Sequence, residues 1–237
     1  MTWSIIFRER TTGRIAVAVA TKFFAVGARV PFVAPQKGAL CTQALFNPLY
    51  GPRGLRLIDE GVGAVDVVRL LIAPDAGREH RQLHVLGADR RFAAHTGSEC
   101  VPWCGHWIGE DLSVAGNMLA GPQVIAETVR FFRENEALPL PRRLIGALKA
   151  GERVGGDKRG KQSAALQIWG DQDYSELDLR VDDHVEPLLE LARLEAASRE
   201  TWTAFRAFLA TDDNPSGIYD RAKINAAVEA SVAAARQ

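Results

Sequence analysis

Thr2 is the residue whose place in the chain offers the most chemistry. The enzyme that removes initiator methionine accepts small second residues, so loss of Met1 would make Thr2 the terminal residue. A terminal threonine carries a hydroxyl nucleophile and an α-amine that acts as its base. The pKa of such an amine, about 7.7–8.0, leaves a neutral fraction near pH 7, whereas an unperturbed lysine leaves almost none. With Met1 attached, the nitrogen of Thr2 is an amide and cannot act as a base. The alternative is that this chain, like many proteins that begin Met-Thr, does not use the threonine at all.

A glycine-rich loop from Gly155 to Gly160 is the second candidate. Glycines let backbone amides turn inward, and Lys158 with Arg159 are suited to hold a carboxylate or phosphate. The alternative is a solvated turn whose charges face water. The spacing imitates a phosphate-binding P-loop, but Gln162 stands where that loop needs a magnesium-binding hydroxyl, and Ser163 begins a predicted strand. The sequence therefore excludes a nucleotide triphosphate site.

Arg53 and Asn117 are single residues with a candidate role. Arg53 opens a predicted helix, where the macrodipole disfavours a cation, so it is expected to face an anionic partner or simply water. Asn117 follows a predicted strand and could offer its amide to a developing oxyanion, or be an ordinary turn asparagine.

Two clusters have metal-ligand side chains. The first holds four ligand types within a short span but in an unusual order for zinc, so buried thiols and ordinary histidines are the alternative: His95, Cys100, Cys104 and His106. The second, Asp182-Asp183-His184, precedes a predicted helix and could cap it instead. We expect no metal at either cluster.

These residues must be positioned by elements that alternate in type along the chain. Strands are predicted at 3–7, 15–20, 28–33, 38–45, 82–97 (a hairpin around Gly87-Ala88-Asp89), 107–109, 112–116, 163–169 and 177–181. The run at 15–20 is apolar on both faces, as in a strand buried between two layers. Pro31 places its strand at an edge or marks a break. Helical spacing predicts helices at 52–61, 64–73, from Pro122, at 142–150, over 187–208, and at the C-terminus. Hairpins rather than βαβ units indicate stacked sheets covered by helices.

Composition narrows the class of protein. The 237 residues carry 29 Lys+Arg against 29 Asp+Glu, and a net charge of zero argues against nucleic acid as a partner. Three cysteines, Cys41, Cys100 and Cys104, make a poor disulfide framework and favour a reducing, cytoplasmic setting. The first residues do not read as a signal peptide, and no apolar run is long enough for a membrane span. We expect a cytoplasmic protein with no membrane partner and no cofactor.

Six segments together resemble one family, that of the domain of unknown function numbered 1028. They are Thr2–Ile5, Thr42-Gln43, Asn47–Gly54, Gly116–Pro122, Gly156–Ala165 and Leu179–His184. The resemblance extends to about residue 195 and implies an N-terminal-nucleophile (Ntn) hydrolase-like fold, a four-layer αββα sandwich of two stacked, mainly antiparallel sheets. We therefore expect a domain at 1–195 and a helical extension packed on it at 196–237. Cys104 departs from the family's pattern, in which alanine commonly precedes the glycine matching Gly105, and this disfavours zinc further.

The resemblance also implies roles for particular residues. Thr2 would be the nucleophile, its freed amine the base, and Asn117 an oxyanion or substrate contact. The residues that would bind substrate are Asp157, Lys158, Arg159, Gln162 and Ser163, with Arg53 as a further candidate.

The sequence thus predicts an amidohydrolase acting on a small or peptide-like amide. The first alternative is a non-catalytic small-molecule-binding protein on the same fold with Met1 retained. The second is an assembly role in which the leucine stripe after Pro187 forms a homodimer interface.

Overall fold

The structure, a computed structural model, describes residues 2–235 and divides into two compact units, one up to Leu191 and one from Ala192 on. Met1, whose removal the predicted chemistry requires, lies outside the described residues. Each unit is considered by itself.

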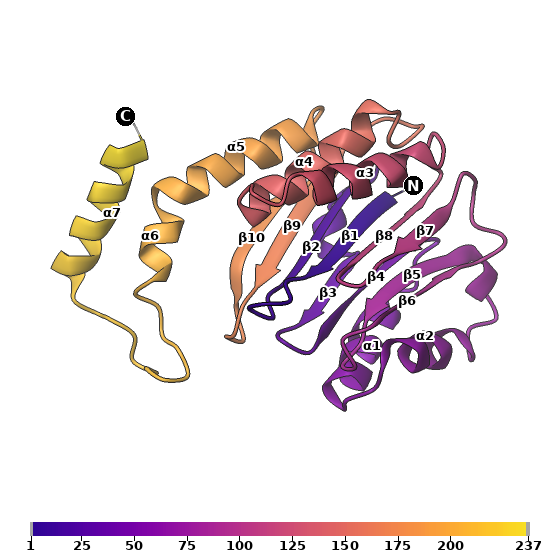
Figure 1. Ribbon diagram of the computed structural model, residues 1–237, viewed down its shortest axis with the longest axis horizontal. Helices are drawn as coiled ribbons and strands as arrows, with labels where there is room; N and C mark the ends of the chain where they lie inside the picture. Colours follow the sequence, from indigo (N-terminus) through magenta and orange to yellow (C-terminus); the bar gives the residue numbers. More distant parts are fainter. Residues whose placement is uncertain (1, 236–237) are drawn as a thin grey trace. The chain divides into compact units, whose positions relative to one another are not determined.

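Two antiparallel sheets build the first unit (Figure 1). The six-stranded sheet has the order β10 (Ser175–Val181), β9 (Ser163–Trp169), β2 (Ile15–Thr21), β1 (Thr2–Arg8), β8 (Leu112–Asn117) and β7 (Gly105–Ile108). The four-stranded sheet has the order β3 (Pro31–Ala34), β4 (Gly38–Ala44), β5 (Arg81–Leu86) and β6 (Phe92–Thr96). β1 is therefore an interior strand with a partner on each side.

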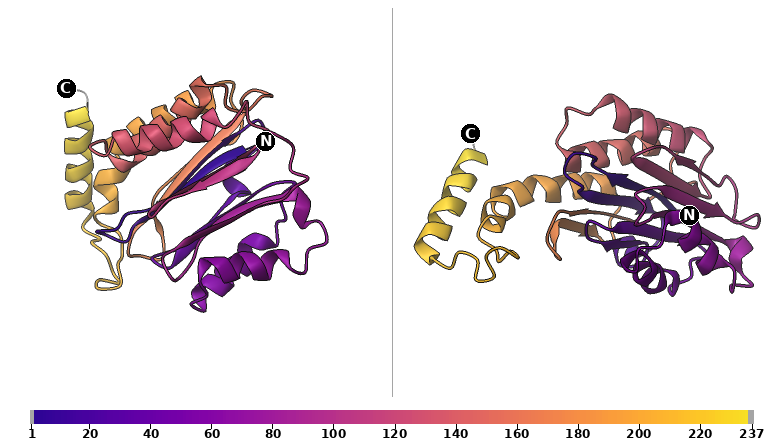
Figure 2. Two further views of the ribbon diagram at one scale, coloured as in Figure 1. Left: turned by 45° about the vertical axis from the view of Figure 1, so that its right-hand side comes forward. Right: turned by 60° about the horizontal axis from the view of Figure 1, so that its bottom comes forward.

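Helices cover the outer face of each sheet, which gives four layers (Figure 2). α3 (Gln123–Glu134) and α4 (Leu140–Arg153) contact the six-stranded sheet, and α1 (Tyr50–Asp59) and α2 (Ala64–Ile72) contact the four-stranded sheet. Short 3₁₀ turns lie at Val26–Ala28 and Arg78–His80. The predicted fold class, two stacked antiparallel sheets covered by helices, is confirmed.

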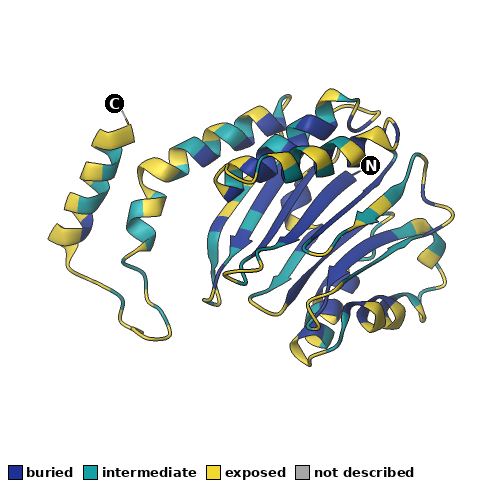
Figure 3. Cartoon of the chain, viewed as in Figure 1, coloured by how far each residue is buried: buried dark blue, intermediate teal, exposed yellow. Residues whose placement is uncertain are grey.

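Alternation along β1 assigns its side chains to two cores. Trp3, Ile5 and Phe7 face the helices, and the ring of Phe7 meets that of Phe132 on α3 at 4.9 Å. The alternate positions, from Thr2 to Ile6, face the second sheet, and Ile6 joins an apolar cluster between the sheets with Val17 of β2. Both faces of the interior strands are buried (Figure 3), so a slip of one residue would exchange the cores.

Several predicted bounds need correction. The strand expected at 28–33 is β3 at Pro31–Ala34, an edge strand, because the chain before it makes a 3₁₀ turn and Pro31 supplies no N–H. α1 begins two residues before Pro52, which the first turn of a helix tolerates, and it ends where Gly61 takes φ +88°. The helix expected at 142–150 is longer, Leu140–Arg153.

The stretch predicted as one helix over 187–208 is two. α5 (Pro187–Glu200) and α6 (Trp202–Arg206) are separate elements, and α7 (Arg221–Ala235) follows after a loop. In the second unit, α6 contacts α7, and the rings of Trp202 and Phe205 are 6.4 Å apart. Among residues 2–235, no helix combines the length and the apolar character needed to cross a bilayer.

Candidate functional site

A row of polar residues crosses four neighbouring strands at one end of the six-stranded sheet. Strand register pairs Ser163 with Thr21, Thr21 with Thr2, and Thr2 with Asn117, on β9, β2, β1 and β8. All four side chains are buried. The row exists because the β1–β2 hairpin runs without a bulge from Arg8 opposite Ile15 to Thr2 opposite Thr21.

Thr2 stands inside this row as the first residue of its strand. Its side chain is 7% exposed, and its Oγ1 lies 3.1 Å from Oγ1 of Thr21. The carbonyl of Thr2 lies 3.5 Å from Nδ2 of Asn117. Among the described residues, no Lys, His, Asp or Glu side chain hydrogen-bonds to the Thr2 hydroxyl.

A chain of neutral polar side chains leads from Asn117 into the space between the sheets. Nδ2 of Asn117 donates to Oε1 of Gln82 at 3.0 Å, and Nε2 of Gln43 donates to the same atom at 2.8 Å. Ser4 Oγ donates to Oε1 of Gln43 at 2.7 Å. His84 lies between Ser4 and Ser113, with each ring nitrogen 2.8 Å from a serine hydroxyl. We call these six residues the neutral relay.

His84 is neutral in the folded protein. It is fully buried, and this burial, with a smaller contribution from His106, lowers its pKa to about 3. The relay therefore carries hydrogen bonds without carrying charge at pH 7.

A cavity of about 380 Å³ opens at the end of the sandwich where Asn117 lies. Its lining combines apolar and polar side chains: Phe23, Ala44, Leu45, His80, Glu99, Val101, Asn117, Met118 and Arg159. Phe23, Leu45 and Val101 are exposed by 49%, 64% and 51%. Exposed apolar side chains grouped around a hollow are typical of ligand sites.

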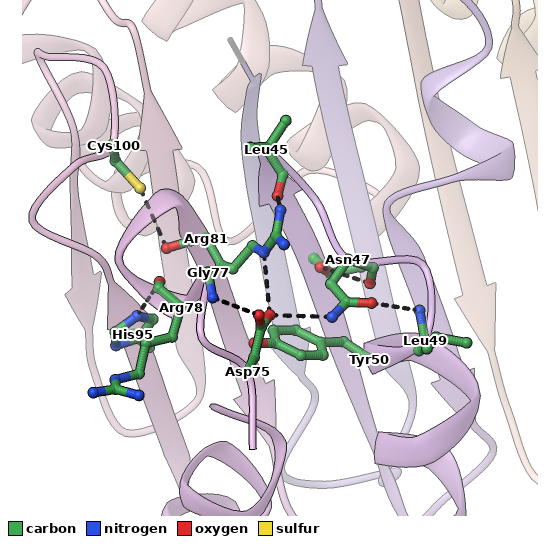
Figure 4. A network of polar contacts seen from close by, with 11 residues as sticks. Leu45, Asn47, Leu49, Tyr50, Asp75, Gly77, Arg78, Arg81, His95 and Cys100 are labelled. Carbon is green, nitrogen blue, oxygen red and sulfur yellow. Dashed lines mark hydrogen bonds and ion pairs between the residues drawn. The ribbon is translucent and has the colours of Figure 1, made fainter. Parts of the chain in front are cut away.

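A second polar cluster is centred on Asp75 (Figure 4), and it contacts Leu45, which lines this cavity. The carboxylate accepts hydrogen bonds from the Tyr50 hydroxyl, Asn47 Nδ2, Arg81 Nε and the Gly77 amide. Arg81 also donates to the carbonyl of Leu45. We call this set the Asp75 clamp, and it fixes the loop that presents Leu45 to the cavity.

The clamp keeps its carboxylate ionised. Burial would raise the pKa of Asp75, but the hydrogen bonds donated by Tyr50, Asn47, Gly77 and Arg81 outweigh it and hold that pKa well below its usual range. Burial, together with the hydrogen bond to Asp75, raises the pKa of Tyr50 far above its usual value.

The predicted loop residues mostly hold the loop itself. Asp157 accepts from the amides of Lys22 and Arg159 and from the Arg159 guanidinium. Lys158 donates to the carbonyl of Pro102, and Gln162 to the carboxylate of Asp183. Of this set, Arg159 lines the larger cavity, whereas Asp157 lines a smaller one of about 150 Å³.

Ser163 and Arg53 have different positions. Ser163 is buried in the polar row, where its hydroxyl donates to the Phe23 carbonyl and accepts from the Val26 amide, so it anchors the segment that carries Phe23. Arg53 is exposed on α1, which covers the outer face of the other sheet, and it lines neither cavity. The structure therefore does not bring Arg53 to the polar row.

The side chains of the candidate zinc ligands contact backbone carbonyls or a hydroxyl and not one another's side chains. His95 meets the carbonyl of Arg78, His106 meets the Thr96 hydroxyl, and Cys100 donates to the carbonyl of Arg81. Cys104 donates to the carbonyl of Cys100. Within residues 2–235, no group of three or more His, Cys, Asp or Glu side chains is arranged to hold a metal ion.

Asn117 and Thr21 show what sequence patterns missed. Asn117 is the last residue of β8, not a turn residue, and both hydrogens of its amide face acceptors inside the protein. Thr21 is the nearest partner of the Thr2 hydroxyl, and counting outward from the predicted Thr11-Thr12-Gly13 turn would have placed it there. The sequence around Gln82 and His84 does not indicate a role in a site, because each residue looks like an inward-facing position of an ordinary strand.

Comparison with known proteins gives one family and one close fold. The model of a family of unknown function, DUF1028, matches residues 2–191. Protein SPO2555 from Silicibacter pomeroyi, a DUF1028 structure, is 28% identical, with a TM-score of 0.84 over 93% of this chain and 96% of that one. Anbu (ancestral beta-subunit) from Yersinia bercovieri is 11% identical, with a TM-score of 0.42 over 83% of this chain and 94% of that one. No curated protein matches.

Proposed function

This chain belongs to the family of unknown function DUF1028, and we propose that it is an N-terminal-nucleophile amidohydrolase acting on a small or peptide-like amide. The observation that carries the proposal is the polar row. Thr2 begins an interior strand, its hydroxyl contacts Thr21, and its neighbour Asn117 lines the 380 Å³ cavity. A nucleophile needs such a place beside a hollow that receives substrate.

The surroundings of Thr2 leave one source for a catalytic base. In the described part of the chain its hydroxyl contacts another neutral hydroxyl and no ionisable side chain. The remaining candidate is the α-amine of Thr2 itself, with a pKa of about 7.7–8.0 once Met1 is removed. This is the chemistry that the sequence resemblance implies, and it calls on no cofactor.

The proposed reaction proceeds in two steps. Oγ1 of Thr2 bonds to the amide carbon while its proton moves to the α-amine, and the C–N bond then breaks as the leaving amine takes that proton. Water attacks the resulting ester, again giving a proton to the α-amine, and the C–O bond to Thr2 breaks as Oγ1 recovers it. Asn117 contributes as a substrate contact beside Thr2.

The test begins with the intact mass of the protein from its source organism. A mass short by one methionine is expected, and such protein should hydrolyse members of a panel of N-acyl and aminoacyl p-nitroanilides. Thr2→Ala should lower kcat/KM by at least about 10³-fold, and Thr2→Ser should retain part of it. Thr11→Ala, in the exposed turn after β1, is the matched control.

Retention of Met1 together with no turnover would remove the proposed base. The same fold and cavity would then favour a non-catalytic small-molecule-binding protein. Turnover that persists in the Thr2→Ala variant would instead show that another group is the nucleophile.

A further inference from the structure

The carboxamide oxygen of Asn117 is a buried acceptor that no described residue satisfies. Asn117 is 1% exposed and is one of the residues that line the larger cavity. An unpaired buried acceptor costs free energy, because it has lost its hydrogen bond to water without gaining another. A ligand that brings an N–H to this place recovers that cost.

Two backbone carbonyls determine which polar atom of the Asn117 side chain has no hydrogen-bond partner. Nε2 of Gln82 lies 3.0 Å from the carbonyl of Gly105 and 2.9 Å from that of Gly116. A carbonyl can only accept, so this end of Gln82 must be its NH₂ group. Its Oε1 then faces Asn117, which must donate through Nδ2. Oδ1 of Asn117 is thereby fixed as the free atom.

The hydrogen bonds of the rest of the relay are consistent with this assignment of donors and acceptors. Because Gln82 Oε1 accepts, Gln43 donates to it and must itself accept from Ser4. The Ser4 proton is then used, so Nε2 of His84 donates to Ser4 and Nδ1 accepts from Ser113. One neutral tautomer of His84 meets both requirements. The polarity is consistent over all six residues.

The cavity lining combines three exposed apolar side chains with the exposed side chains of His80, Glu99 and Arg159. Phe23, Leu45 and Val101 all line the cavity, and each is at least about half exposed. The positive charge of Arg159 is already paired with Asp157 at 3.3 Å. The lining therefore fits an apolar substituent attached to a group that donates a hydrogen bond.

We propose that the cavity recognises amides that pair an N–H donor with an aliphatic substituent. The N–H binds Oδ1 of Asn117, the substituent contacts Phe23, Leu45 and Val101, and Gln82 is the positioning residue that makes Asn117 an acceptor. This inference rests on the proposed function, because it names the class of substrate for the same cavity. It assigns Asn117 an accepting role, in place of the donor role expected from the sequence.

The experiment compares two probes of equal shape. The first is 3-methylbutanamide; the second is 4-methylpentan-2-one, in which a methyl replaces the NH₂. Both are titrated by ¹H–¹⁵N NMR into the Thr2→Ala protein, which cannot turn the amide over. The amide should bind about tenfold more tightly than the ketone. Acetamide, which lacks the aliphatic group, should bind at least about tenfold more weakly than 3-methylbutanamide.

Variants test whether Asn117 and Gln82 cause the preference for the amide over the ketone. In the same background, Asn117→Ala and Gln82→Met should each reduce the amide-to-ketone ratio to below about twofold, while ketone affinity changes little. A role confined to folding would weaken both probes together. Asn135→Ala, at the half-buried C-terminal cap of α3, and Gln123→Met, at its exposed first residue, are the matched controls and should keep the full ratio.

Equal binding of amide and ketone would overturn the proposal, as would no detectable binding of the amide or a ratio that survives Asn117→Ala. If the Asn117 and Gln82 variants fail to fold, the ratio in the parent protein still decides. The readout is binding without the nucleophile, so failure of Thr2 chemistry leaves it intact. An amide preference without any turnover would support the recognition and count against the hydrolase.

Discussion

The neutral relay is a buried polar cluster and the Asp75 clamp is a half-buried one, and they hold their residues in different ways. The relay joins six uncharged side chains in a line, in which each donor or acceptor determines the next. The clamp gathers four donors on one carboxylate, none of which depends on the others for its direction. The relay ends on Asn117, and the clamp ends on Leu45, at two walls of one cavity.

The difference shows that one kind of cluster can fix which way an amide group points, while another fixes where its partner residues lie. Amides and hydroxyls have two distinguishable ends, so a line of them transmits polarity from the carbonyls of Gly105 and Gly116 to Asn117. A carboxylate accepts in every direction, so the clamp transmits no polarity but holds its partners strongly through its charge. The two clusters should therefore respond differently to pH.

The largest expected effect comes from titrating His84. Its folded pKa of about 3 lies below the usual value of 6.5, so its contribution to stability is complete above pH 6.5 and is lost as pH falls. Between pH 6.5 and pH 4 the loss is on the order of 3 kcal/mol. His84→Gln, which can keep one donor and one acceptor, should remove this dependence. Urea unfolding at pH 7, 5.5 and 4 measures it.

At pH 7 the His84→Gln variant should have a lower free energy of unfolding than the wild type. This difference should shrink as the pH falls towards 4, because the wild type loses stability and the variant does not. Parallel stability curves for the two proteins would mean that the relay does not hold a neutral histidine. His80→Gln, at an exposed position, gives the baseline for replacing a histidine.

Asp75→Asn should have the next largest effect. At least one of the four donors would then face an NH₂ group, which costs about 2 kcal/mol in the free energy of unfolding at pH 7. Because the pKa of Asp75 is held below its usual range, its contribution is present above about pH 3.9 and lost only below that. The deficit of the variant should stay constant from pH 7 to pH 5, unlike that of His84→Gln.

Asp66→Asn, in an exposed pair with Arg69, should change the same free energy by less than about 0.5 kcal/mol. A deficit of Asp75→Asn that changed already between pH 6.5 and pH 5 would erase the distinction between the two clusters.

Arg81→Lys should have the smallest effect. The guanidinium reaches both Asp75 and the carbonyl of Leu45, and one ammonium group cannot span both. We expect a loss of about 1 kcal/mol in stability and faster hydrogen exchange at the Leu45 amide, which bonds to the carbonyl of His80. Arg78→Lys, on the exposed neighbour, should leave that exchange unchanged; an unchanged rate in Arg81→Lys would show that the clamp does not fix Leu45.

Much of the fold could be predicted because its signals are local. The continuous apolar run over 15–20 and the helical spacing over 64–73 each identify an element, and Pro31 marks an edge strand. The failures also have local causes. A helical pattern over 187–208 cannot show the break near Thr201, since nothing in that stretch is a strong helix breaker.

The site was harder to predict, because its contacts join residues far apart in the chain. The loop from Asp157 to Ser163 stands out by composition, yet most of its side chains bind the loop and its neighbours. Gln82, Gln43 and His84 look like ordinary strand positions, and their role depends on which sheet face they share. Only the pairing of both sheets shows that these residues meet.

The unbroken β1–β2 register has a consequence for how this chain can vary. Position numbers across the hairpin add up to the same total in every pair, so Thr2 reaches Thr21 only if neither paired strand gains or loses a residue. One residue inserted within a strand, without a bulge, would pair Thr2 with a neighbour whose side chain points to the opposite face. The far end of the hairpin, at Arg8 and Ile15, is thus as restricted in length as the site itself, although it touches nothing there. Insertion scanning should find both strands intolerant and the exposed turn around Thr11 permissive.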